Sequence, residues 1–158
     1  MIIKKTFSCS LVFIFVLLFF TVQAGAEAIL VASVKTLKGE VSIIRENNEI
    51  PVQLGNDVFK NDTIKTGNDS AVGLVFLDDS LMSLGPESVL QVNQFEFEPA
   101  FNKLGFVSKI MKGTATYLSG IIGKLAPKSV KFETPHATLG LRGTHFAVMV
   151  EEEKEGKQ

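Results

Sequence analysis

Two histidines, His136 and His145, are the residues of this chain that could most readily bind a transition metal or serve as a general base. A zinc site needs three or four ligands, usually His combined with Cys, Asp or Glu. The only cysteine, Cys9, lies in an apolar N-terminal run, so it is not available to complete such a set. His145 falls in a strand-like segment, and His136 follows Pro135 in an expected turn. The sequence therefore predicts no metal site and no cofactor.

Carboxylates and hydroxyls are the other candidate groups, because they could bind calcium or act as nucleophiles. The candidate calcium ligands are Asp57, Asp62, Asp69, Asp78 and Asp79. Their spacing differs from that of an EF-hand loop, and Asp is common in turns because its carboxylate accepts nearby backbone N–H bonds. No Ser or Thr lies in a strand-to-helix nucleophile elbow. We predict no catalytic residue and expect the protein not to be an enzyme.

The most distinctive local motif is Arg142-Gly143-Thr144. In a functional interpretation, Arg142 would pair through its bidentate fork with an acidic group on a partner. In a structural interpretation, Gly143 permits a tight turn or bulge and Arg142 pairs within the domain. We favour the structural interpretation. The eight phenylalanines that follow residue 26, together with Tyr117, are likewise expected to fill a core and not a ligand cage.

The N-terminus has the three parts of a secretory signal peptide. Lys4 and Lys5 precede an apolar run, and the small residues Ala24-Gly25-Ala26 follow it. We predict cleavage after Ala26, with Val22-x-Ala24 as a second possible site and an uncleaved membrane anchor as the alternative. Residues 1–26 are then a signal peptide, residues 27–150 the domain and residues 151–158 a polar, disordered tail. The expected location is the periplasm or the outside of the cell, without membrane insertion after cleavage.

The charge of the remaining chain excludes two classes of partner. After residue 26 the chain has 14 basic and 17 acidic residues, and no Lys or Arg cluster. A mildly acidic chain does not attract phosphate backbones, so we predict no binding to nucleic acid. Without a Lys or Arg cluster it also has no surface for anionic lipid, so we expect no peripheral membrane binding. Because no cysteine lies in this part, the domain must be stabilised by packing alone.

Short apolar runs separated by Gly, Asn, Asp and Pro predict an all-β domain. Asn47-Asn48 is expected to form a turn, and a bulge near Asn93 is expected because Leu90 and Phe95 have opposite phases. The predicted strands are 29–36, 40–45, 49–54, 71–77, 81–84, 89–92, 94–98, 105–111, 114–118, 130–133 and 144–150, with a single helical turn over 120–125.

A weak repeat runs through the middle of the chain. Three segments each end in serine before an apolar run: Asn68-Asp69-Ser70, Asp78-Asp79-Ser80 and Pro86-Glu87-Ser88. This spacing suits short strands joined by tight turns, as in a sandwich, and equally the rungs of a β-roll or solenoid. The sequence leaves these two arrangements open.

The turn motifs occur in an order that resembles the FecR domain family, over about Leu37 to Val150. The motifs are Leu54-Gly55-Asn56-Asp57, Asp62 to Gly67, Phe76 to Ser80, Leu84 to Ser88, Lys112-Gly113, Phe132 to Ala137 and Leu141 to Phe146. The resemblance implies an extracytoplasmic all-β domain. Its motif residues, expected to be structural, are Gly67, Asp78, Ser80, Pro135, Arg142, Gly143, Thr144 and Phe146.

In the best-known relatives, an anti-sigma segment and a membrane helix precede this domain, which senses an outer-membrane receptor. Only about ten residues precede the apolar run here, so we do not expect the transmembrane signalling role to carry over. We expect a non-catalytic interaction module that binds another envelope protein in signalling or assembly. The alternative is a cell-surface protein that binds a glycan or small ligand.

The C-terminal strand suggests one route to a partner. If Thr144–Val150 lies at a sheet edge, its unpaired backbone groups could pair with a partner strand. The charges of Glu151–Glu153 could instead guard that edge against aggregation. The sequence does not decide between these roles.

Overall fold

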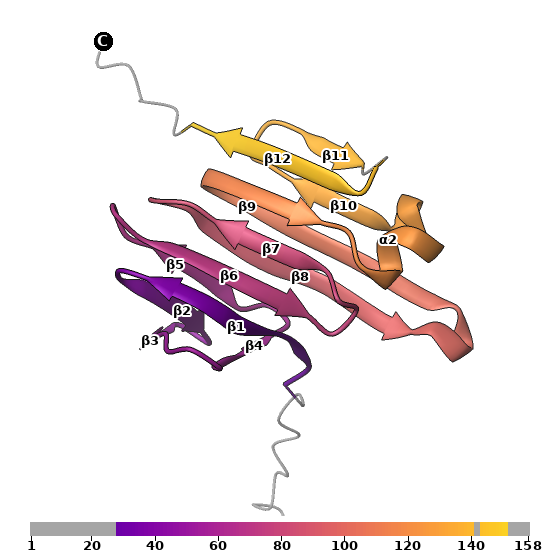
Figure 1. Ribbon diagram of the computed structural model, residues 1–158, viewed down its shortest axis with the longest axis horizontal. Helices are drawn as coiled ribbons and strands as arrows, with labels where there is room; N and C mark the ends of the chain where they lie inside the picture. The colour runs from indigo at the N-terminus through magenta and orange to yellow at the C-terminus, as the bar shows by residue number, and fades with distance from the viewer. Residues whose placement is uncertain (1–27, 141–142, 152–158) are drawn as a thin grey trace, which may run out of the picture.

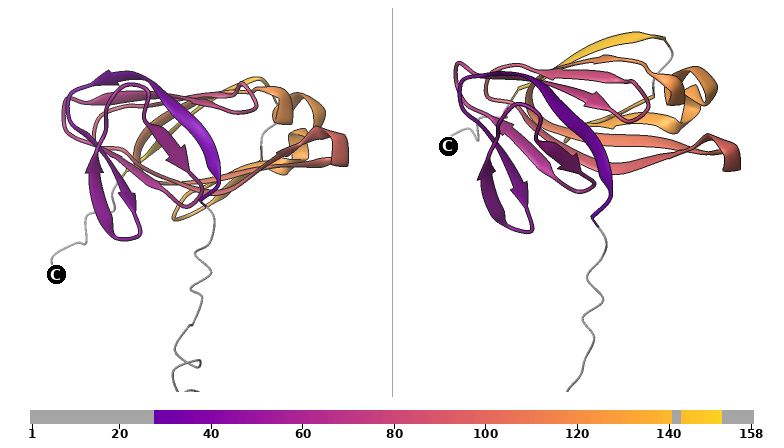
Figure 2. Two further views of the ribbon diagram at one scale, coloured as in Figure 1. Left: turned by 90° about the horizontal axis from the view of Figure 1, so that it is seen from below. Right: turned by 60° about the horizontal axis from the view of Figure 1, so that its bottom comes forward.

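The computed structural model describes residues 28–140 and 143–151, and within them the chain folds into one strongly curled sheet of twelve strands (Figure 1). The halves of the sheet face each other, and their inward side chains form the core (Figure 2). All strand pairs are antiparallel except β9 with β10. The all-β prediction is confirmed. No helix of the described residues is long and apolar enough to cross a membrane.

Each half of the sheet is called a layer here. Layer 1 has the order β4-β1-β6-β7-β9-β12, and layer 2 the order β3-β2-β5-β8-β9-β10-β11. The strands of layer 1 are β1 (Leu30–Lys38), β4 (Asp57–Phe59), β6 (Ala71–Phe76), β7 (Leu81–Leu84) and β12 (His145–Val150). Those of layer 2 are β2 (Val41–Arg45), β3 (Asn48–Pro51), β5 (Thr63–Thr66), β8 (Val89–Glu98), β10 (Val130–Glu133) and β11 (Thr138–Gly140).

The long strand β9 (Lys103–Leu118) belongs to both layers. Its first part pairs with β8 and β10 in layer 2, and its last part pairs with β7 and β12 in layer 1. The strand passes from one layer to the other at Gly113, whose φ is +87°. The prediction of two separate strands, 105–111 and 114–118, was wrong because Gly113 bends the strand without ending it.

Four crossings between the layers stack along one end of the sheet. The chain crosses at Gly39-Glu40, at Gly67–Ser70, at Gly85–Ser88 and at Gly113, and we call these crossings the arches. Backbone bonds join successive arches, from Gly67 N to Glu40 O and from Gly85 N to Thr114 O. The fold thus combines the two arrangements that the sequence left open: facing sheets and stacked, solenoid-like turns.

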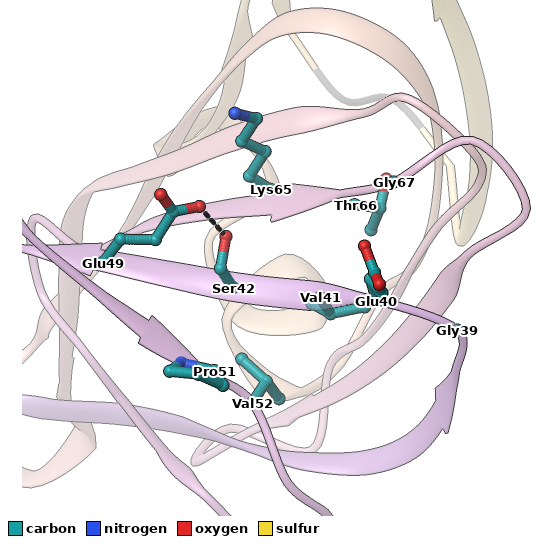
Figure 3. Close-up of a pocket in the computed structure, with 10 residues that line it drawn as sticks. All are labelled: Gly39, Glu40, Val41, Ser42, Glu49, Pro51, Val52, Lys65, Thr66 and Gly67. Carbon is teal, nitrogen blue, oxygen red and sulfur yellow. Dashed lines mark hydrogen bonds between the residues drawn. The ribbon is translucent and has the colours of Figure 1, made fainter.

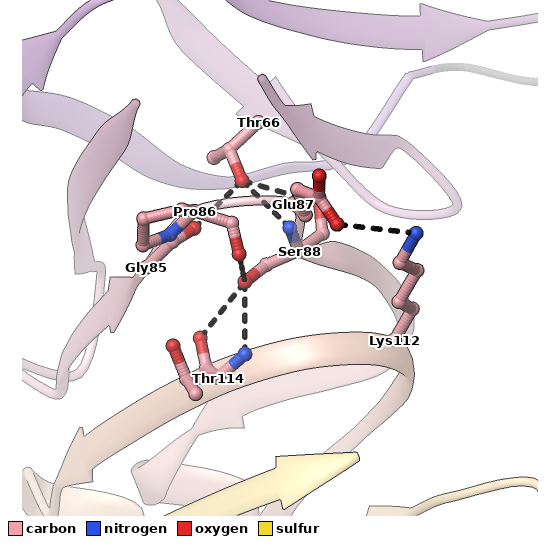
Figure 4. Close-up of polar contacts among 7 residues, drawn as sticks. All are labelled: Thr66, Gly85, Pro86, Glu87, Ser88, Lys112 and Thr114. Atoms are coloured by element: carbon pink, nitrogen blue, oxygen red, sulfur yellow. Dashed lines mark hydrogen bonds and ion pairs between the residues drawn. The ribbon is translucent and has the colours of Figure 1, made fainter. Parts of the chain in front are cut away.

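The repeated serines explain how the arches are held. Each hydroxyl oxygen accepts the backbone N–H of a residue distant in sequence. Ser70 accepts from Glu40 at 2.8 Å, Ser88 from Thr114 at 2.9 Å and Ser80 from Gly120 at 3.0 Å. All three serines are buried. Ser70 and Ser88 lie in the arches, as Figure 4 shows for Ser88, whereas Ser80 lies at the opposite end beside α2 (Ile121–Leu125).

Aromatic rings fill the space between the layers. Phe106 on β9 lies at the centre, with ring centroids 4.8 Å from Phe76, 5.4 Å from Tyr117 and 5.7 Å from Phe132. Edge-to-face and offset contacts at these distances stabilise aromatic pairs beyond simple burial. Phe132 in turn stacks on Phe146 of β12, at 5.0 Å. These rings therefore serve as core, as expected from the sequence. The expectation was wrong for Phe101, which lies in the turn between β8 and β9 and has 74% of its surface accessible.

Several local predictions can be compared with the elements. The helical turn is α2, followed by the 3₁₀ turn η2 (Pro127–Ser129), and the bulge lies between Val92 and Gln94. The turn expected at Asn47-Asn48 begins one residue earlier, with positive φ at Glu46 and Asn47. The short elements β4, β5, β11 and the 3₁₀ turn η1 (Pro99–Phe101) were not predicted, because segments of three or four residues show too little alternation.

Candidate functional site

The strand β12 is the outermost strand of layer 1 (Figure 1), and among the described residues it hydrogen-bonds only to β9. The register is continuous from His145 opposite Leu118 to Val150 opposite Gly113. One side of β12 is therefore an open sheet edge. Such an edge presents unpaired N–H and C=O groups that can pair with another strand.

The backbone geometry shows which groups are free. The carbonyl of Thr144 accepts the amide of Ser119 at 2.8 Å, so Thr144 directs its polar groups toward β9. Successive residues of a strand direct these groups to opposite sides. His145, Ala147 and Met149 therefore direct their N–H and C=O groups away from β9, toward the open side.

Apart from His145, the side chains of β12 are apolar, and the strand contains no Asp, Glu, Lys or Arg. His145, Ala147 and Met149 are exposed on the outer face, and Met149 has 68% of its surface accessible. Phe146 and Val148 point inward and are half-buried against the core. Leu139 of β11, which ends layer 2 on the same side of β9, is also only partly buried. This end of the molecule thus has an incompletely covered apolar interior.

The other edges lack this combination of length and apolar character. Natural proteins guard edge strands with charges, proline, bulges or short length. The edge strand β3 contains Glu49 and Pro51, while β4 and β11 have three residues each. Among the described strands, β12 alone is an edge of six residues without charge or proline.

The outer faces of the two layers also differ in their content of charged side chains. On β6, β7, β12 and the last part of β9, the described outward side chains include no Asp, Glu, Lys or Arg. Leu81 and Leu118 lie opposite each other there, and each has over two-fifths of its surface accessible. Layer 2 instead presents charged residues outward: Lys65, Glu96, Lys103, Lys109, Lys131 and Glu133. The uncharged face adjoins the open edge.

A groove of about 670 Å³ lies on layer 2 around β2, β3 and β5 (Figure 3). Ser42 donates a hydrogen bond to Glu49 within it, at 2.6 Å, and Lys65 and Glu40 contribute opposite charges. Its lining contains no aromatic side chain. Sugars are commonly held by stacking on aromatic rings, which this groove does not provide.

Two motif residues, Asp78 and Ser80, form a buried polar cluster with Tyr117. The Asp78 carboxylate accepts bonds from the Ser80 hydroxyl at 2.8 Å and from the amide of Ile122 at 3.1 Å. The Ser80 hydroxyl lies 2.9 Å from the Tyr117 hydroxyl. Burial raises the pKa of Tyr117, the Ser80 hydrogen bond lowers it in part, and the charge of Asp78 raises it further. The cluster fixes α2 to the turn between β6 and β7.

The remaining motif residues lie apart from this cluster. Gly67 lies in the second arch, where its amide bonds to Glu40 O. Pro135 and Gly143 are exposed, and Thr144 and Phe146 lie at the start of β12. Arg142 lies outside the described residues, so its predicted pairing stays a prediction. The signal peptide predicted at residues 1–26 and the tail after Glu151 also lie outside them.

The metal candidates do not converge in the part of the chain that the structure describes, where no group of three or more His, Cys, Asp or Glu side chains could hold an ion. His136 and His145 are both exposed. Asp62 is buried and pairs with Arg45, whose Nε and NH2 groups lie 2.9 and 2.7 Å from its two oxygens. That aspartate thus has a structural partner.

A family model described as FecR protein matches residues 62–158. This chain belongs to the FecR family. The FecR match covers β5 through β12 and so includes Ser70, Ser80, Ser88 and the open edge. It begins at Asp62, later than the Leu37 start inferred from the motifs, although β1 to β4 pair into the same sheet. The FecR family is associated with envelope signalling and is regulatory.

No curated protein and no solved structure matches the chain. The FecR assignment therefore identifies the family, and the arrangement of β12 supplies the specific hypothesis about this member.

Proposed function

We propose that this FecR-family chain is an exported, non-catalytic interaction module of the bacterial envelope, which binds another envelope protein by accepting an extended strand at β12. The observation that carries the proposal is the open edge of β12, where His145, Ala147 and Met149 direct their backbone groups away from β9. Strand addition uses main-chain hydrogen bonds for affinity and side-chain pockets for specificity.

The side chains around the edge support the same mode of binding. An incoming strand would continue layer 1, and its inward side chains would lie beside Phe146 and Val148, which are half-buried. Burial of apolar area contributes about 25 cal/mol per Å², so covering this end stabilises the complex. The association of the family with envelope signalling agrees with a protein partner.

Export is the second part of the proposal and rests on the signal-peptide pattern of residues 1–26. Expression of the full chain in a bacterium, followed by intact-mass measurement of the accumulated protein, tests it. We expect a mature chain that begins at Glu27 in the periplasmic fraction. A full-length chain retained in the cytoplasm would contradict export.

The binding mode can be tested with paired substitutions at Ala147. The Ala147→Pro variant removes an N–H that points away from β9, so the internal pairing of β12 keeps its hydrogen bonds. Ala147→Val keeps that N–H and is the matched control. Tagged full chains are crosslinked in the native envelope, captured and identified by mass spectrometry, with folding checked by circular dichroism.

We expect one envelope protein to be enriched with the wild-type chain and with Ala147→Val, and to be lost with folded Ala147→Pro. Equal enrichment with both variants would show that the partner binds elsewhere. No enrichment with the folded wild-type chain would contradict the proposed function.

A further inference from the structure

We propose that β12 pairs with β12 of a second copy of this chain, antiparallel, about a two-fold axis that passes through Ala147. This inference rests on the proposed function in that both place a strand on the open side of β12. It differs in its occupant, which here is the protein itself. Closed two-fold dimers are the commonest assembly of identical chains.

The free backbone groups of β12 fit this pairing. An antiparallel partner exchanges two hydrogen bonds with each residue whose polar groups face it. With Ala147 opposite Ala147 of the second copy, His145 lies opposite the second Met149, and Met149 opposite the second His145. All three outward-directed residues are then paired, giving about six hydrogen bonds. A shift of the register by two residues leaves some of these groups unpaired.

The orientation of these groups is fixed at both ends of the β9 ladder. Ser119 donates to Thr144 on the β12 side, and the carbonyl of Thr114 accepts from Gly85 on the β7 side. Odd-numbered residues at the end of β9 therefore direct their backbone N–H and C=O groups toward β12, and even-numbered residues direct theirs toward β7. The continuous register between β9 and β12 carries this alternation along the strand to Val150.

The side chains are compatible with the axis as well. In this register, opposite residues lie on the same face of the combined sheet. Phe146 would lie opposite Val148 of the second copy on the inner face, joining two half-buried apolar patches. On the outer face the small Ala147 meets itself. Because β12 contains no Asp, Glu, Lys or Arg, no like charges are brought together at the axis.

A second copy of β12 fits the open edge better than either terminal segment of the same chain would. Inward positions beside Phe146 and Val148 call for apolar side chains on alternate residues. Residues 152–158, Glu-Glu-Lys-Glu-Gly-Lys-Gln, contain none. Residues 1–26 are the predicted signal peptide, which on the proposed function is removed before the chain acts. The alternation of β12 itself, with Phe146, Val148 and Val150 inward, matches the requirement.

Self-pairing has a consequence for partner binding. A β12 edge covered by a second copy is closed to other strands, so a partner protein must displace that copy. The dimer would then hold the module in an unoccupied state until the partner competes for the same hydrogen bonds.

Cysteine substitution tests the proposed register. All variants are full chains in which Cys9 is replaced by serine, so the introduced thiol is unique. Cα atoms of a hydrogen-bonded antiparallel pair lie about 5.5 Å apart, within the range of a disulfide. Ala147→Cys should therefore form a disulfide dimer under mild oxidation. The measurement is a non-reducing gel with mass spectrometry of each crosslinked band.

Two control positions are exposed on the same outer face. Met149→Cys is more accessible, but two copies of residue 149 would lie about 14 Å apart along the paired strands. Thr116→Cys faces Ala147 from β9, and its two copies would lie about 14 Å apart across the sheet. Neither should crosslink, whereas combining His145→Cys with Met149→Cys should restore the dimer.

We expect the fraction of disulfide dimer to be at least about tenfold higher for Ala147→Cys than for either control. Equal crosslinking at Ala147 and Met149 would overturn the two-fold register, and an absence of any dimer would overturn self-pairing. A mixed disulfide between Ala147→Cys and a different protein, with no disulfide dimer formed by the isolated chain, would also overturn it, while leaving the proposed function in place.

Discussion

The amide of Thr114 donates a hydrogen bond to the hydroxyl oxygen of Ser88 across 2.9 Å, although the two residues are 26 positions apart. The contact joins the third arch to the point where β9 changes layers (Figure 4). The Ser88 hydroxyl also lies 3.1 Å from the carbonyl of Thr114 and 3.2 Å from that of Pro86. The amide of Ser88 itself bonds to Thr66 at 2.8 Å. One buried serine therefore connects three segments of backbone.

Ser88→Ala should lower the free energy of unfolding by about 1–3 kcal/mol, because it leaves the partly buried amide of Thr114 without its acceptor. The control is Ser83→Ala on β7, since that side chain is exposed on the outer face. Its effect should stay within about 0.5 kcal/mol. Urea unfolding of both variants measures the difference. Similar midpoints for the two would show that the Ser88 hydroxyl does not stabilise the arches.

Gly113→Ala should destabilise the fold by at least about 1 kcal/mol, because residue 113 has a φ of +87° and an added Cβ would overlap Ser88. Gly140→Ala is the matched control, since its φ is not positive and open space surrounds that position. Thermal unfolding followed by circular dichroism compares the two variants. A melting temperature for Gly113→Ala equal to that of Gly140→Ala would contradict the assigned bend.

Asp62→Asn should lower the free energy of unfolding by about 2 kcal/mol. The carboxylate of Asp62 accepts two bonds from Arg45 and one from the amide of Phe59, and Arg45 lies 4.3 Å above the ring of Phe59. The hydrogen bond between Arg45 and Asp62 is the main reason that the pKa of Arg45 is raised. The exposed turn residue Asp69 supplies the control, Asp69→Asn. Comparable losses in denaturant titrations of both variants would argue against the Arg45 pair.

Tyr117 should titrate at a higher pH in the folded chain than in denaturant, because burial raises its pKa. It is the only tyrosine and the chain has no tryptophan, so tyrosinate absorbance reports this residue alone. The unfolded chain should titrate near pH 10, the ordinary value. The stability due to the neutral phenol is complete below that pH and is lost as the pH rises through the folded pKa. Identical titrations in both states would contradict this environment.

The sequence predicted much of the fold where the signal is local. The positions of α2, of β10 and of the bulge beside Asn93 followed from glycine, proline and alternation. The repeat ending in Ser70, Ser80 and Ser88 was also visible. The role of these serines could not be predicted, because each accepts a hydrogen bond from a backbone amide that is 26 to 40 residues away in sequence.

The candidate site was harder to predict than the fold. The short apolar run Phe146–Val150 indicates a strand, but the strand is an edge only because of where β9 and β10 lie. The parallel pairing of β10 with β9 depends on the return of the chain through α2 and η2, and no short motif encodes it. Edge position is thus a property of topology, and propensity alone does not specify it.

The presence of β9 in both layers affects how the protein unfolds. Release of β9 removes the partner of β7 and β12 in one layer and of β8 and β10 in the other, so both layers lose strand pairs together. Small single domains usually unfold in one all-or-none step, and a strand common to both layers favours this behaviour. Amide protons on both sides of Gly113 should then exchange with solvent through the same global opening, at one common free energy.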